Sequence, residues 1–215
     1  MNKKYILFDL DGTLTDPALG ITNAVAYGLK EIWGIEVEDK KTLNKFIGPP
    51  LLEAFSQEYG FSTEDSQKTL DKYREYYRSR GLFENIMYDG VPEMLAQLRA
   101  RGKKLFVATS KPEEFSIKIL KHFGIYDYFD FVAGASFDTS RAKKADVIKY
   151  ALDQNGIADV SRLIMVGDRE HDVLGAKEHG IGTIGVLYGY GSREEFAAAG
   201  ATYIAETVED ILKFV

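Results

Sequence analysis

Short apolar runs that alternate with helical segments constrain the fold of this chain more than any other feature. Six runs of strand length are almost continuously apolar, at residues 5–10, 104–110, 129–135, 163–167, 182–187 and 201–204. Segments with helical spacing lie between them or follow them, at residues 92–101, 115–123, 145–154, 172–179 and 208–214. Continuous rather than alternating apolar strands are typical of parallel sheets that are covered on both faces. We therefore predict an α/β fold with a doubly wound, Rossmann-like parallel sheet.

One stretch interrupts this alternation. From residue 15 to residue 86 the chain shows only helical patterning, at residues 19–33, 41–46, 51–59 and 63–80, without a strand-like run. A helical block of this length is more simply an inserted subdomain than a single crossover. We expect an α/β core domain of residues 1–14 and 87–215 and an α-helical cap domain of residues 15–86. In the cap, we expect Tyr73, Tyr76, Tyr77 and Phe83 to pack inward.

Composition excludes several classes of protein. The 27 Lys and Arg against 33 Asp and Glu give a net charge of −6, whereas binding of a nucleic acid polymer needs clustered basic residues. The chain has no cysteine, which excludes disulfides, thiolate metal sites and a cysteine nucleophile. Without a long apolar run or a signal-peptide pattern, we expect no membrane association and a cytoplasmic location. The sequence gives no indication of the oligomeric state.

Acidic residues follow the first apolar run, in the segment Phe8-Asp9-Leu10-Asp11-Gly12-Thr13-Leu14. Residues two apart on a strand point to the same side, so we expect Asp9 and Asp11 to face one side at the carboxyl end of this strand. Ligands bind at that end in open α/β sheets. A strand-ending turn is the simpler structural explanation, because Asp and Gly are common in turns.

Three further motifs also follow apolar runs or begin helices. Thr109 and Ser110 end the second run before a helix, where a hydroxyl can bind a phosphate oxygen or simply cap the helix. Lys143 and Lys144 lie at the start of a helix, which can simply be a solvated basic surface. Because the helix dipole favours acids at this end, the two bases indicate a functional role. Asp168 ends a run and Asp172 begins the next helix, a placement that suits a hard cation with oxygen ligands.

The ordered set of motifs resembles the haloacid dehalogenase superfamily, in particular its phosphoglycolate-phosphatase-like branch, which includes members that act on nucleotides. The resemblance spans nearly the whole chain. It rests on the DxDGT segment from Asp9 to Thr13, the hydroxyl of Thr109, a lysine near Lys144 and the GDxxxD segment from Gly167 to Asp172. The helical insert resembles the cap that follows the first strand in this family.

The resemblance implies a Mg²⁺-dependent phosphatase of small phosphomonoesters. Asp9 would be the nucleophile that forms an aspartyl-phosphate, and Asp11 would protonate the leaving oxygen and then activate water. Thr109 and a lysine would bind the phosphoryl oxygens, and we place Gly12 and Ser110 in the same phosphate-binding set. Mg²⁺ would be held by Asp9, the backbone carbonyl of Asp11, and Asp168, with Asp172 binding it directly or supporting a ligand. Four acids at one sheet edge repel one another unless cations compensate them, which independently favours a metal.

Several alternatives stay open at the level of the sequence. We prefer Lys144 as the phosphate-binding lysine because Lys-Ala-Asp-Val-Ile leads into the helix, with Lys143 as the alternative. β-Phosphoglucomutase-like phosphoryl transfer is the nearest rival activity, and dehalogenation is disfavoured by the second acid, Asp11. Phosphonate cleavage would need a cap lysine such as Lys30, Lys40, Lys41 or Lys45. A non-catalytic phospho-aspartate module is disfavoured by the insert, and the motifs do not identify the phosphomonoester.

Overall fold

The computed structural model describes residues 3–137 and 140–215 and divides into two compact units. Unit 1 comprises Met1–Thr15 and Met87–Val215, and unit 2 comprises Asp16–Ile86. We expected domain boundaries at residues 14/15 and 86/87, and the two units divide at residues 15/16 and 86/87. Met1 and Asn2, which begin the expected core domain, lie outside the described residues.

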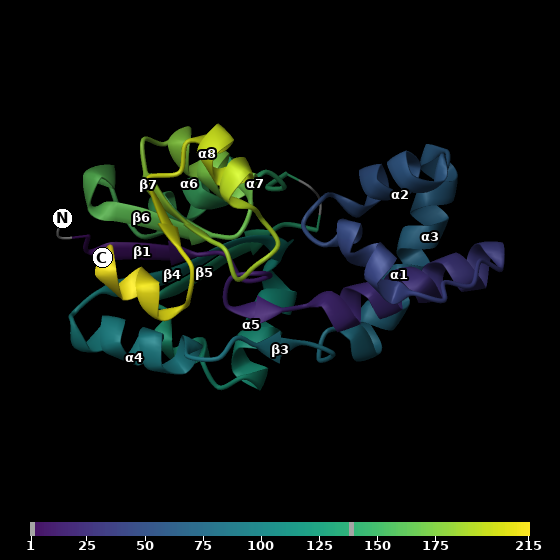
Figure 1. Cartoon of the computed structure of the whole chain (residues 1–215), viewed down its shortest axis with the longest axis horizontal. Helices are drawn as coiled ribbons and strands as arrows, with labels where there is room; N and C mark the ends of the chain where they lie inside the picture. Colours follow the sequence, from purple (N-terminus) through teal and green to yellow (C-terminus); the bar gives the residue numbers. More distant parts are fainter. Residues whose placement is uncertain (1–2, 138–139) are drawn as a thin grey trace. The chain divides into compact units, whose positions relative to one another are not determined.

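The main sheet of unit 1 has six parallel strands in the order β5-β4-β1-β6-β7-β8 (Figure 1). They are β1 (Tyr5–Phe8), β4 (Lys104–Pro112), β5 (Phe131–Ala135), β6 (Leu163–Gly167), β7 (Gly182–Val186) and β8 (Tyr203–Ala205). Their core residues are buried on both faces, as continuous apolar runs require. This confirms the predicted α/β fold with a doubly wound parallel sheet.

Helices cover both faces of this sheet. In Figure 1, α6, α7 and α8 lie on one side of the strands, and α4 and α5 lie on the other. Their bounds are α4 (Val91–Ala100), α5 (Glu113–His122), α6 (Lys144–Gln154), α7 (Glu170–Lys177) and α8 (Arg193–Ala199). One core cluster packs residues of β1, β4 and β6, such as Leu7, Phe106 and Met165, against Val147 and Ile148 of α6.

The strand order reverses at β1, and this determines where a ligand can bind. The chain proceeds from β1 to β4 and β5 on one side of β1, and then to β6, β7 and β8 on its other side. Connections that leave β4 and β6 therefore diverge to opposite sides beyond the carboxyl end of β1. This divergence is the topological switch point at which open α/β sheets bind ligands.

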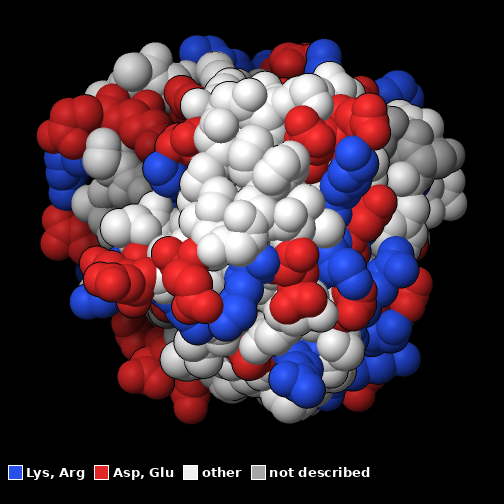
Figure 2. Space-filling model, turned by 90° about the vertical axis from the view of Figure 1, so that its right-hand side faces the viewer, with Lys and Arg blue, Asp and Glu red and all other residues white. Residues whose placement is uncertain are grey.

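Unit 2 is built from helices around its own apolar core. Its elements are α1 (Ala18–Trp33), a 3₁₀ segment (Lys40–Phe46), α2 (Leu51–Tyr59), α3 (Thr63–Tyr76) and a π-helical turn (Tyr77–Gly81). Gly28 allows α1 to approach α3 closely, because a Cβ atom there would lie 2.8 Å from the carbonyl oxygen of Thr69. On the face of unit 2 shown in Figure 2, acidic and basic side chains are interspersed around an uncharged area.

The structure differs from the expected elements in four places. Two short strands, β2 (Thr15–Asp16) and β3 (Ile86–Met87), pair at the ends of the segment expected to lack strands. The helix α8 was not anticipated, and the expected C-terminal helix is a short 3₁₀ segment, Glu209–Lys213. Phe83 is 47% exposed, so the expectation that it packs inward is wrong, whereas Tyr73 and Tyr77 are buried.

Over residues 3–137 and 140–215, the longest apolar helical stretches fall short of what a membrane crossing requires.

Candidate active site

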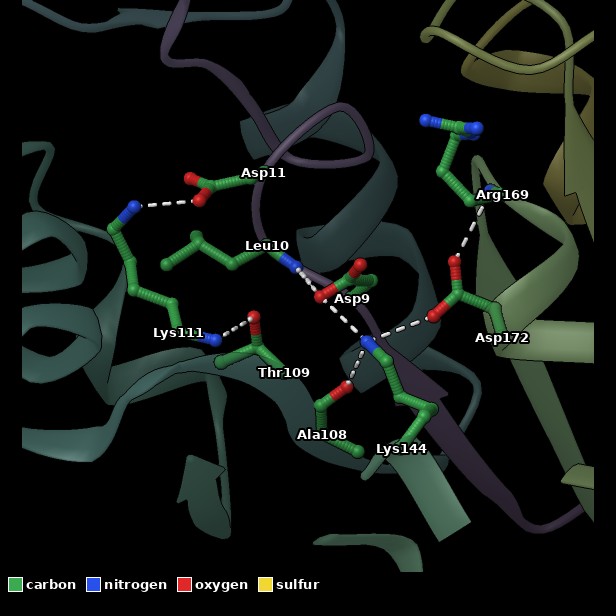
Figure 3. A network of polar contacts seen from close by, with 9 residues as sticks. All are labelled: Asp9, Leu10, Asp11, Ala108, Thr109, Lys111, Lys144, Arg169 and Asp172. Atoms are coloured by element: carbon green, nitrogen blue, oxygen red, sulfur yellow. Dashed lines mark hydrogen bonds and ion pairs between the residues drawn. The ribbon is translucent and has the colours of Figure 1, made fainter. Parts of the chain in front are cut away.

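Asp9 and Asp11 lie in the loop that follows β1, because this strand ends at Phe8. The backbone N–H of Asp9 donates to the carbonyl of Val166 on β6 at 2.9 Å, and Oδ1 of Asp9 accepts the N–H of Leu10 at 2.8 Å. The two carboxylates contact different lysines, Asp9 contacting Lys144 and Asp11 contacting Lys111 (Figure 3). Because neither acid belongs to the strand, the loop after β1 and not strand alternation determines where the two carboxylates lie.

Three carboxylates from separate elements gather at the switch point. Asp9 follows β1, Asp168 follows β6, and Asp172 lies in the first turn of α7. One oxygen from each lies within 4.8 Å of the others. Asp168 and Asp172 are 2% and 1% exposed, so water compensates little of their charge.

Lys144, the first residue of α6, supplies a buried positive charge to this cluster. Its Nζ lies 2.7 Å from Oδ1 of Asp172 and 2.9 Å from Oδ1 of Asp9, and it donates to the carbonyl of Ala108 at 3.0 Å. Burial alone would lower the pKa of Lys144, but the charges of Asp172 and Asp9 outweigh burial and raise it. Its neighbour Lys143 is exposed, whereas Lys144 contacts the carboxylate cluster; that Lys144 binds phosphate stays a prediction.

Burial shifts the pKa values of two acids in the cluster, Asp168 and Asp172. Desolvation raises the pKa of Asp168 well above its usual range, and the charges of Asp172 and Asp9 add to this effect. Burial likewise raises the pKa of Asp172 to about 6, although the charge of Lys144 opposes the shift. One lysine among three carboxylates leaves the cluster short of positive charge, and a hard divalent cation with oxygen ligands would compensate it. The residues present therefore fit Mg²⁺.

Asp11 forms a second, smaller group with two residues of β4, Thr109 and Lys111. Its Oδ2 lies 2.5 Å from Nζ of Lys111, whose backbone N–H donates to Oγ1 of Thr109 at 3.2 Å. Burial raises the pKa of Asp11, and the charge and hydrogen bond of Lys111 oppose the shift without cancelling it. Thr109 is buried, whereas Ser110 is exposed. Lys111 thus contacts a proposed catalytic acid.

Gly12 is required where the chain turns away from Asp11. Its φ is +78°, which an L side chain rarely adopts. A Cβ atom at this position would lie 2.0 Å from Oδ2 of Asp168. Gly12 therefore allows the loop after β1 to pack directly against the carboxylate of Asp168.

The loop after β7 is a part of the site that the sequence analysis missed. The hydroxyl of Tyr188 donates to the carbonyl of Thr13 at 2.9 Å, and the N–H of Tyr190 donates to Oδ2 of Asp168 at 3.0 Å. A Cβ atom on Gly189 would lie 2.3 Å from the carbonyl oxygen of Gly12. The Tyr-Gly-Tyr-Gly sequence directly after an apolar run was the signal available for this loop.

Acids and lysines form two tight groups at the switch point of a doubly wound sheet, an arrangement suited to a hydrolytic enzyme. Comparison with known proteins gives the family of this chain. Residues 6–186 match the family model described as haloacid dehalogenase-like hydrolase. The chain belongs to this family, which confirms the resemblance predicted from its motifs.

Individual relatives agree with this assignment. A 5′-nucleotidase of Pseudomonas aeruginosa is 46% identical over 198 residues, which cover 92% of this chain and 89% of that protein. The tyrosine-protein kinase PtkA of Mycobacterium tuberculosis is 41% identical over 210 residues, which cover 97% of this chain and 71% of that protein. The crystal structure of a predicted phosphatase from Clostridium acetobutylicum has a TM-score of 0.93 and 47% identity, covering 100% of this chain and 98% of that one. The chain is an enzyme of the phosphatase type within this family.

Proposed function

We propose that this protein is a Mg²⁺-dependent phosphatase that hydrolyses a small phosphomonoester through an aspartyl-phosphate on Asp9. The observation that carries the proposal is that Asp9 and Asp11 pair with different lysines. Asp9 shares Lys144 with Asp172, whereas Asp11 pairs with Lys111 outside the carboxylate cluster. Two acids in different electrostatic environments suit two roles, a nucleophile and a proton carrier.

In the first step, the carboxylate of Asp9 attacks phosphorus and the bond from phosphorus to the leaving oxygen breaks. Leu10 N–H and Lys144 hold Oδ1 of Asp9, so Oδ2 would form the new bond. Asp11 donates a proton to the leaving oxygen, which departs as an alcohol. The raised pKa of Asp11 favours the protonated form that this step needs.

In the second step, Asp11 accepts a proton from a water molecule as this water attacks the phosphorus of the aspartyl-phosphate. Asp9 is then released as a carboxylate, and inorganic phosphate leaves. Lys144 and Thr109 would neutralise and orient the phosphoryl oxygens during both steps. A Mg²⁺ ion bound by Asp9, the carbonyl of Asp11, and Asp168, with Asp172 nearby, would neutralise the carboxylates and polarise the phosphoryl group.

For the substrate, we favour a nucleoside 5′-monophosphate over phosphoglycolate. The support is the 46% identity with the Pseudomonas aeruginosa 5′-nucleotidase, whereas a phosphoglycolate phosphatase of Colwellia psychrerythraea is 29% identical. Either substrate is a small phosphorylated metabolite, whose anionic phosphate the buried Lys144 can bind.

Phosphate release from a metabolite panel tests this proposal. The panel contains nucleoside 5′-monophosphates, phosphoglycolate, sugar phosphates and phosphotyrosine, each with Mg²⁺ or with EDTA, and without a bisphosphate activator. We expect Mg²⁺-dependent release of inorganic phosphate, with the highest kcat/KM for a nucleoside monophosphate. Transfer of phosphate between positions of a sugar, dependent on a bisphosphate and without net release, would instead establish the mutase alternative.

A further inference from the structure

A bulge in β4 presents Thr109 and Lys111 to the site. On β4 and β5, Ala108 pairs with Ala133, but the next paired residues are Pro112 and Ala135, so the register shifts across residues 109–111. Bulges bend a strand and redirect its side chains, and they are frequent next to active sites. Here the bulge lies at the carboxyl end of β4, next to the switch point.

The opposite strand is adapted to this bulge. A Cβ atom on Gly134 of β5 would lie 2.4 Å from Cα of Glu113 and 2.7 Å from the carbonyl oxygen of Lys111. Any side chain at position 134 would therefore push the bulge away. Glu113 also accepts the N–H of Gly134 at 3.3 Å, and Arg141 donates to the Gly134 carbonyl at 2.7 Å. The conformation of the bulge is thus fixed by contacts behind it.

The bulge aims Lys111 at Asp11. Oγ1 of Thr109 accepts the backbone N–H of Lys111, and Nζ of Lys111 lies 2.5 Å from Oδ2 of Asp11. The side chains of Lys111 and Asp11 are only 6% and 19% exposed. A charge-assisted hydrogen bond that is shielded from water orients a carboxylate strongly. The other oxygen of Asp11, Oδ1, is buried and has no hydrogen-bond partner among the described residues.

We propose that Lys111 is a positioning residue that acts through Asp11. By engaging Oδ2, Lys111 fixes the carboxyl group so that Oδ1 carries the proton. That proton passes from Oδ1 to the leaving oxygen as the bond from phosphorus to this oxygen breaks and the bond from Asp9 forms. This inference rests on the proposed function, because it assigns to Lys111 the orientation of the acid in that mechanism.

The dependence of the rate on the leaving group distinguishes this role from direct binding of substrate. An alkoxide leaving group, such as the 5′-oxygen of a nucleoside, needs the proton from Asp11. p-Nitrophenolate is stable as an anion and needs little help. Loss of a positioning lysine therefore slows nucleotide hydrolysis selectively, whereas loss of a phosphate-binding lysine slows both substrates equally.

The experiment measures kcat/KM of K111M for adenosine 5′-monophosphate and for p-nitrophenyl phosphate, since kcat/KM reports the phosphoryl-transfer step of both. General acid catalysis contributes about 10²–10⁴-fold, and mispositioning removes part of it. We expect a loss of about 10–100-fold for the nucleotide and less than about threefold for p-nitrophenyl phosphate. K111R, which keeps a cation, recovers part of the nucleotide activity. The control K149M removes an exposed lysine of α6 that pairs with Asp153 and leaves both values unchanged.

A double-mutant cycle completes the test. In a D11N background, K111M has no acid to position, so we expect it to change nucleoside release by less than about twofold. An equal loss on both substrates, an undiminished loss in D11N, or no loss on either substrate overturns the role of Lys111. The proposed function fails separately, if the wild-type protein releases no phosphate from any phosphomonoester. If K111M does not fold, K111R and D11N/K111R decide by the same comparison of substrates.

Discussion

At the scale of single residues, the site depends on positions where only one residue type fits. Gly12 combines a left-handed backbone with direct packing against Asp168. Gly175 is constrained in a similar way, because a Cβ atom there would lie 2.9 Å from Cβ of Lys144. Substitutions at these positions therefore act on the geometry of the carboxylate cluster as well as on stability.

We predict that Gly12→Ala weakens metal binding more than it weakens the fold. The left-handed conformation costs about 1–2 kcal/mol for an L residue, and the new methyl group must displace the carboxylate of Asp168. The Mg²⁺ concentration for half-maximal activity should rise about tenfold, as for other changes that disturb a metal ligand from outside. Gly102→Ala is the matched control, because Gly102 has φ +72° and nothing within 4 Å of its Cβ position. Equal Mg²⁺ requirements in the two variants would contradict the prediction.

Sequence motifs located most of the site residues, and the structure shows why their arrangement was harder to predict. Asp9, Asp168, Asp172 and Lys144 meet because parallel strands end at one edge of the sheet, which a sequence pattern can indicate. The separation of Asp11 from this cluster depends on where β1 ends and on a bulge in another strand, 100 residues away. Local patterns contain no information about such pairings. The roles of these residues in catalysis stay predictions.

At the scale of elements, most of the expected strands and helices are present in the structure, although their first and last residues differ. The elements that were not predicted, α8, β2 and β3, were difficult to predict for physical reasons. α8 is short and alanine-rich, although Ser192 caps it by accepting the N–H of Glu195 and Phe196 is fully buried. The Ser-x-x-Glu pattern was its signal. β2 and β3 have two residues each, too few to produce a periodic pattern.

The loop after β7 carries a prediction at this scale. Tyr188→Phe removes the hydrogen bond to the carbonyl of Thr13 and retains the ring that packs edge-on against Tyr88. A hydrogen bond is worth about 1 kcal/mol, so we expect kcat to fall about fivefold as the loop with Asp9 and Asp11 loosens. Steady-state kinetics with Tyr203→Phe as control checks this, since Tyr203 stacks on Phe214 at the sheet edge. Wild-type kcat in Tyr188→Phe would show that the loop does not position the site.

At the scale of the whole molecule, the acidic cluster links metal binding to stability and pH. Burial raises the pKa values of Asp168, Asp172 and Asp11, so the folded chain retains protons that the unfolded chain releases above about pH 4. These groups therefore destabilise the metal-free fold increasingly as pH rises through their folded pKa values. Bound Mg²⁺ would replace the protons and remove this cost.

We accordingly expect saturating Mg²⁺ to raise Tm more at about pH 8 than at about pH 5, where protons compete for the carboxylates. Thermal unfolding followed by circular dichroism, with Mg²⁺ or with EDTA at each pH, measures the difference. The variant D168N, which lacks one acid of the cluster, should lose most of the Mg²⁺-dependent gain. An equal gain at both pH values would show that these carboxylates do not hold the ion.

Phosphate release by Asp9→Asn tests the proposed mechanism most directly, because the whole mechanism depends on one nucleophilic carboxylate. We expect the wild-type protein to release inorganic phosphate with Mg²⁺ and the variant to lose about 10³-fold or more of kcat, while its circular dichroism spectrum and cooperative unfolding are retained. A folded Asp9→Asn protein that keeps wild-type turnover would contradict the mechanism.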